Sequence, residues 1–130
     1  MGNTVILIAN QMMHGKEFIQ QDDEEVVIAV AELNMRAGKK AMDGCDHKTA
    51  HSYLQAALAL LPNNHWERYY DLSLRLHFWV ASAANSNLKE EESELILNKI
   101  LVKARCIEDK LPSYFLLCQR KCHLIFIHLL

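Results

Sequence analysis

The sequence predicts an all-α protein with a single domain, and three observations lead to that prediction. Only two prolines and four glycines occur among 130 residues, so few positions break a helix. The apolar residues recur at intervals of three and four instead of alternating, which is the spacing of helices that pack on one side. The mass of 15.0 kDa fits a single domain. We therefore expect residues 1–130 to form one domain of about five or six helices, paired as antiparallel hairpins.

The first two predicted helices span about residues 5–19 and 23–42. The earlier segment is apolar and ends at a glutamine-rich, acidic joint. Asp22, three residues before Glu25, has the spacing of a capping box and is the predicted N-cap of the second helix. The apolar residues of this second helix step by four, three, four and four onto one face, and they are Val26, Val30, Leu33, Ala37 and Ala41.

The next two predicted helices span residues 48–61 and 65–84. A turn at residues 43–46 precedes the first of them and supplies an N-cap, and Pro62 ends it. Asn64 stands three residues before Glu67, which predicts the start of the second. This long helix is apolar around more than half of its circumference. It must therefore contact neighbours on both sides, as the middle helix of a layered array does.

Two further helices are predicted over residues 90–107 and 114–130, with Pro112 separating them. The first begins with glutamates and ends with basic residues, in the order that matches the helix macrodipole, and we interpret the acidic run as a solvated helix start. The last helix carries more exposed apolar surface than an independent C-terminus should. Because an array normally ends in a polar cap, we expect residues 111–130 to be a divergent or truncated end of a natural parent that continues.

Charge and motifs exclude several classes of function. The net charge of −2 comes from scattered residues, so the chain lacks the basic footprint that nucleic acid or an anionic membrane requires. The apolar run at 124–130 is too short to span a bilayer, and residues 1–9 lack the positive charge of a signal peptide. We therefore predict a cytoplasmic protein with no membrane segment. The motifs GxxxxGK[ST], GxGxxG, GxSxG and HExxH do not occur, so we predict no enzyme activity, no catalytic residue and no cofactor.

Two clusters of cysteine and histidine support an alternative, a small metal-binding or redox protein. His47 and His51 stand four residues apart beside Asp43, Cys45 and Asp46. All five are residue types that bind zinc, although no second pair at ligand spacing follows. The competing interpretations are solvent-facing histidines beside an N-cap aspartate and cysteines that fill the core as small hydrophobes. We predict no metal at either cluster. The second cluster consists of Cys118, Cys122, His123 and His128.

An aromatic cluster allows two interpretations. It could form a ledge for a peptide or a nucleotide base. Its spacing along one helix favours packing between helices, which is our prediction. The cluster consists of His65, Trp66, Tyr69 and Tyr70.

Three blocks of sequence resemble a known family. They are LNMRAGKKA at residues 33–41, YLQAALALLP at 53–62 and WERYYDL at 66–72. Together they resemble the tetratricopeptide-like helical region that follows the AAA-type ATPase module of very large signalling proteins, in which serine/threonine-kinase-like, ATPase, GAF and histidine-kinase domains share one chain. The resemblance covers about residues 5–110 and implies hairpins stacked as a short tetratricopeptide-like solenoid. None of that family's nucleotide-binding or phosphotransfer residues falls in this segment.

The small residues of these blocks have a direct physical role. Ala37, Gly38 and Ala41 allow the following helix to approach closely, and Ala50 and Ala57 do the same from the other side. The resulting hypothesis is a non-catalytic scaffold for protein interaction or interdomain coupling in a signal-transducing ATPase/kinase-like protein. Its partner would be a protein, a peptide or a neighbouring domain, and uncapped repeat ends would allow self-association. The candidate partner-binding residues are Arg36, Lys39, Lys40, Arg68, Tyr69 and Arg75.

Overall fold

The computed structural model describes residues 24–129, and over residues 123–128 it describes only the path of the helix. The predicted helix at 5–19 and the predicted cap Asp22 lie outside the described residues. The described part of the chain contains no strand, so the all-α prediction is confirmed. Its helices are α2 (Glu24–Asp43), α3 (His47–Leu60), α4 (His65–Arg68), α5 (Tyr70–Ser86), α6 (Glu90–Lys103) and α7 (Ile107–Leu129).

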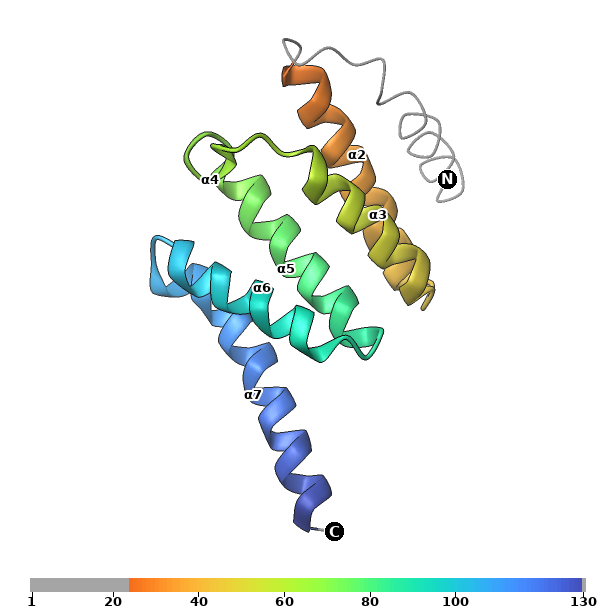
Figure 1. Ribbon diagram of the computed structural model, residues 1–130, viewed down its shortest axis with the longest axis vertical. Helices are drawn as coiled ribbons and strands as arrows, with labels where there is room; N and C mark the ends of the chain where they lie inside the picture. The colour runs from red at the N-terminus through yellow and green to blue at the C-terminus, as the bar shows by residue number, and fades with distance from the viewer. Residues whose placement is uncertain (1–23, 130) are drawn as a thin grey trace.

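Helices that follow one another along the chain pack against one another (Figure 1). α2 packs on α3, α3 on α5, α5 on α6 and α6 on α7, and α5 also contacts α2 and α7. The long helices alternate in direction, so α2 with α3 and α5 with α6 form antiparallel hairpins. α5 has neighbours on both sides, as its broad apolar surface predicts. Because α5 contacts both α2 and α7, these three helices share one side of the stack.

The α2–α3 hairpin depends on small side chains at the helix crossing. A Cβ atom on the buried residue Gly38 would lie only 2.5 Å from Cγ of Leu54 and 3.3 Å from the backbone oxygen of Ala50. No heavier side chain fits there unless Leu54 leaves its rotamer or α3 moves away. The predicted close approach of the two helices is therefore confirmed. The alanines of this crossing are buried as well, and they are Ala37, Ala41, Ala50 and Ala57.

The turn between α2 and α3 follows its prediction closely. Asp46 is the N-cap of α3, and its side chain accepts a hydrogen bond from the Thr49 backbone N–H at 3.3 Å. Such a cap satisfies one of the donors that a helix start leaves unpaired. Asn64 stands at the N-cap position of α4, as predicted, but its side chain makes no capping hydrogen bond.

Three predicted features of the helices are wrong. The helix expected over 65–84 is divided at Tyr69, whose backbone (φ −131, ψ 52) ends α4 and begins α5. The helix expected to end at 107 stops at Lys103, and the last helix starts at Ile107 rather than 114, with Pro112 inside it. Tertiary contacts explain the early start, because the Tyr70 hydroxyl accepts a hydrogen bond from the Arg105 backbone N–H at 2.8 Å and donates one to the carboxylate of Asp109 at 2.6 Å. The α6–α7 turn is thereby fixed to α5.

One arginine of α7 forms ion pairs with α6. The Arg120 guanidinium lies 3.4 Å from the Glu90 carboxylate and 3.2 Å from that of Glu94, and its side chain is only 15% exposed. The acidic start of α6, predicted to be solvated, therefore also anchors α7. No helix in the described residues is both long and apolar enough to cross a membrane.

Candidate functional site

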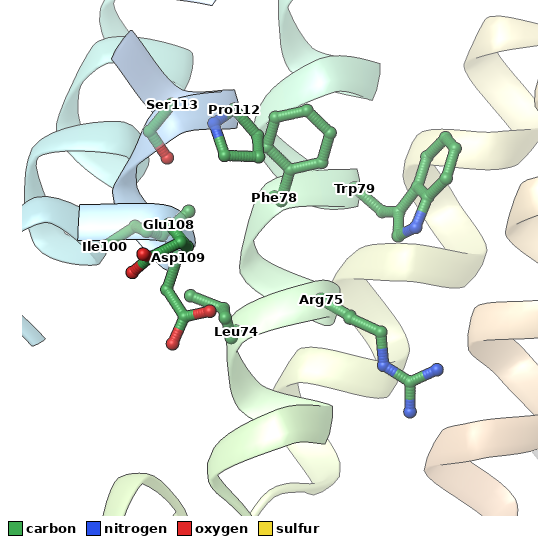
Figure 2. Close-up of a pocket in the computed structure, with 9 residues that line it drawn as sticks. All are labelled: Leu74, Arg75, Phe78, Trp79, Ile100, Glu108, Asp109, Pro112 and Ser113. Carbon is green, nitrogen blue, oxygen red and sulfur yellow. The ribbon is translucent and has the colours of Figure 1, made fainter. Parts of the chain in front are cut away.

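A pocket lies between α5 and the first turns of α7, on the side of the stack that these helices share with α2. Its volume is about 190 Å³. Figure 2 shows Phe78 from α5 beside Pro112 from α7, with Trp79 and Arg75 farther from α7. The remaining lining residues are Leu74, Ile100, Glu108, Asp109 and Ser113. The pocket thus combines an apolar interior with charged groups at its edges.

The apolar surface continues along α7. A shallower hollow of about 770 Å³ shares Phe78, Glu108 and Pro112 with the pocket and extends to Leu111 and Phe115. The Phe115 side chain is 67% exposed. Large exposed apolar groups that adjoin a pocket are typical of surfaces that bind another protein segment.

The basic residues predicted from α2 and α5 lie beside the pocket. The Lys39 ammonium stands 5.3 Å from the centroid of the Trp79 ring, which lines the pocket. Arg75 lines it directly and is held by a hydrogen bond of 3.4 Å from its Nε to the Asp71 carbonyl. Arg36 is exposed one turn before Lys39.

The neighbouring Lys40 is exposed as well. Among the described residues, none of the four makes an ion pair. They are Arg36, Lys39, Lys40 and Arg75, and their charge is available to a partner.

The other two candidates have intramolecular partners. Arg68 forms an ion pair with Glu24 at the start of α2 and lies 5.5 Å from the Tyr69 ring centroid. Tyr69 is half-buried against the core, and burial together with a hydrogen bond to the Glu24 carboxylate raises its pKa. The two residues therefore join the α4–α5 break to α2, at the opposite end of α2 from Lys39.

One of the two acidic residues that line the pocket already has partners within the protein. The hydrogen bond from Tyr70 lowers the pKa of Asp109, with a smaller effect in the same direction from Arg105. Arg105 also stacks on the Tyr70 ring at 4.1 Å. Glu108 is exposed at the mouth, so the α7 side of the pocket is acidic while the α2 side is basic.

A comparison with protein-family models, with curated proteins and with solved structures found no match.

The first histidine cluster is joined to α6. Nε2 of His51 lies 3.1 Å from the Glu92 carboxylate, and the Gln55 side chain donates a hydrogen bond to the same oxygen. His51 is half-buried rather than solvent-facing as the competing interpretation expected. Within residues 24–122 and 129, no three His, Cys, Asp or Glu side chains lie close enough together to share a metal ion.

The cysteine prediction is wrong in one respect. Cys118 and Cys122 were expected to fill the core, but both are exposed, as are Cys45 and Cys106. The helical rotation explains this, because the buried or half-buried side of α7 carries Ser113, Leu116 and Leu117 and leaves the cysteines on the other side. The side chains of the remaining two cluster members, His123 and His128, lie outside the described residues.

The aromatic cluster packs between helices, as predicted. Trp66 is 8% exposed and lies 4.7 Å from the ring of His77, which sequence analysis did not single out. The His77 Nδ1–H donates a hydrogen bond to the Ser73 carbonyl at 2.7 Å, and burial lowers the pKa of His77 to about 4. The stacked ring of His65 lies 5.4 Å away, and its pKa is lowered by burial and by Lys99. A neutral histidine pair is therefore part of this core.

Proposed function

We propose that this protein is a non-catalytic helical scaffold that binds a segment of another protein along the side formed by α2, α5 and α7. The observation that supports this most directly is the pocket between α5 and α7, because it joins an apolar interior to an exposed apolar surface and to unpaired cations. Apolar anchors that fill pockets supply most of the affinity in such complexes, and charges at the rim supply orientation and rate.

The chemistry of the surface defines the partner. An anchor the size of a leucine or phenylalanine side chain suits the pocket beside Phe78 and Pro112. The unpaired cations on the α2 side favour carboxylates in the same segment, on the side of the anchor that lies over Lys39 and Arg75. We therefore expect an acidic peptide with one or two large apolar residues.

The resemblance to signalling proteins supports one version of this proposal. In that version the bound segment belongs to a neighbouring domain of the same chain, and the scaffold couples domains of an ATPase/kinase-like protein. The proposed cellular location is cytoplasmic. The alternative of a metal-binding or redox protein receives no support from the described residues, since His51 is engaged by Glu92. Zinc analysis of protein purified without added metal tests that alternative, and stoichiometric zinc would favour it.

Charge reversal at the rim tests the proposed surface. Peptides selected from a displayed random library on the wild-type protein should share a large apolar residue flanked by Asp or Glu. For such a peptide we expect Arg75→Glu, and separately Lys39→Glu with Lys40→Glu, to weaken binding about tenfold in fluorescence anisotropy, because an attraction becomes a repulsion.

The matched control is Lys48→Glu on α3, which reverses an exposed charge away from the pocket. It should leave the affinity within about twofold. Selected peptides without acidic residues, or equal affinities for the wild type and Arg75→Glu, would contradict the proposal.

A further inference from the structure

The pocket between α5 and α7 contains a buried polar group that the fold leaves unsatisfied. Ser113 of α7 lines the pocket and is only 1% exposed. Its hydroxyl oxygen has no hydrogen-bond partner among the described residues. In Figure 2 this hydroxyl points from α7 toward Ile100 and Glu108, which line the same pocket. The inner wall of the pocket therefore carries a hydroxyl that is available to a bound group.

The other two buried serines show how this fold satisfies such a hydroxyl. Ser73 donates a hydrogen bond to the His65 carbonyl at 3.0 Å, and Ser93 donates one to the Ala81 carbonyl at 2.9 Å. Burying a hydroxyl without a partner costs free energy, because the hydrogen bonds that it makes to water are lost. The exception, Ser113, is the buried serine that lines the pocket. This coincidence favours a partner that a bound ligand supplies.

The remaining polar side chains of the pocket are engaged or lie at its edge. Asp109 accepts a hydrogen bond from the Tyr70 hydroxyl at 2.6 Å. Arg75 and Glu108 are both exposed, so they face the residues that flank an anchor. Ser113 is therefore the side chain that can select the chemistry at the inner end of the anchor itself.

We propose that the anchor of the bound peptide is a tyrosine whose hydroxyl forms a hydrogen bond with the Ser113 hydroxyl. This inference rests on the proposed function, since it names the side chain that fills the pocket. The rings of Phe78 and Pro112 provide apolar walls for an aromatic ring. A tyrosine presents a hydroxyl at the far end of such a ring, and both hydroxyl groups can donate and accept. A leucine or phenylalanine anchor would leave the Ser113 hydroxyl unpaired.

Two peptides that differ by one oxygen atom test this inference. Both have an anchor flanked by acidic residues, which is tyrosine in one and phenylalanine in the other, and fluorescence anisotropy measures their affinities. We expect the wild-type protein to bind the tyrosine peptide about tenfold more tightly, because the phenylalanine peptide leaves the buried hydroxyl unpaired. In Ser113→Ala the two affinities should agree within about twofold, since this variant removes the partner of the tyrosine hydroxyl.

A serine outside the pocket provides the matched control. Ser52→Ala removes an exposed hydroxyl from α3 and should keep the tenfold preference. Equal affinities of the two peptides for the wild type would overturn the inference and leave the proposed function standing, because both peptides still bind. An unchanged preference in Ser113→Ala would overturn it as well. If neither peptide binds saturably, the proposed function fails and the inference fails with it.

Urea unfolding distinguishes this role of Ser113 from a structural one. Ser113→Ala should leave the unfolding midpoint of the free protein unchanged or raise it. The hydroxyl has no partner there among the described residues, and alanine is the better helix former. A lower midpoint would show that the hydroxyl is paired within the free protein and would contradict the inference.

Discussion

Gly38→Val is expected to lower the free energy of unfolding by about 3 kcal/mol. Even the first added carbon would lie 2.5 Å from Cγ of the fully buried Leu54, and valine adds two more carbons. Either α2 and α3 must separate or Leu54 must leave its rotamer. Gly38→Ala should cost less, about 1–2 kcal/mol, because alanine also gains roughly 1 kcal/mol of helix propensity over glycine. Urea unfolding followed by circular dichroism measures these differences.

A neighbouring glycine and a double variant make this prediction specific. A Cβ atom on Gly44 meets nothing closer than the Ala41 backbone oxygen at 3.7 Å, so Gly44→Ala should be nearly neutral. Leu54→Ala alone should cost about 2–5 kcal/mol, because it leaves a cavity. In the double variant the valine at position 38 occupies that space, and the combined loss should fall at least about 1 kcal/mol short of the sum. Additive losses would show that Gly38 and Leu54 are not in contact.

Acidification is expected to destabilise the protein through His77. Its pKa is about 4 in the folded state, chiefly because it is buried, against about 6.5 in the unfolded chain. Between these two values the unfolded chain binds a proton that the folded protein does not. The contribution of His77 to stability is therefore complete above pH 6.5, declines as the pH falls from 6.5 to about 4, and is fully lost below about 4. The shift corresponds to a loss of about 3 kcal/mol.

Urea unfolding at pH 7, 5.5 and 4 measures this loss. His77→Phe keeps an aromatic ring beside Trp66 but cannot be protonated, so its stability should change much less over this range. A smaller dependence should persist from His65, whose pKa is also lowered. Asp109 also has a lowered pKa, but it loses its contribution below about pH 4, outside the range tested. An unchanged pH dependence in His77→Phe would assign the acid sensitivity to another group.

The helices could be predicted from the sequence where local signals act alone. The period of α2, the cap at Asp46 and the small residues at Gly38 each have a local cause that the sequence carries. The start of α7 could not be predicted, because the hydrogen bonds from Arg105 and to Asp109 converge on Tyr70, which is more than thirty residues earlier in the chain. The position of Pro112 predicted a break between the last two helices at that residue instead.

Only part of the candidate binding surface could be predicted from the sequence. The cations Arg36, Lys39, Lys40 and Arg75 could be chosen by residue type, but the pocket needs Phe78 and Pro112 to meet across two helices. Arg68 and Tyr69 also have side chains suited to binding a partner, but in the folded protein both contact Glu24. That contact between helices could not be predicted from the sequence. The exposure of Cys118 and Cys122 depends on the rotation of α7, which Arg120 sets through contacts with α6. A helical pattern defines a face, and tertiary contacts decide where that face points.

The most direct test of the proposed binding surface is a titration of the isotopically labelled protein with a selected acidic peptide, followed by NMR spectroscopy of the backbone amides. We expect the shift changes to concentrate at residues 36–40 of α2, 75–79 of α5 and 108–112 of α7, which surround the pocket. Saturable changes confined to these segments, and weakened in Arg75→Glu, are the result that the proposal predicts. Changes confined to α3 and α6, or no saturable change with any selected peptide, would contradict it.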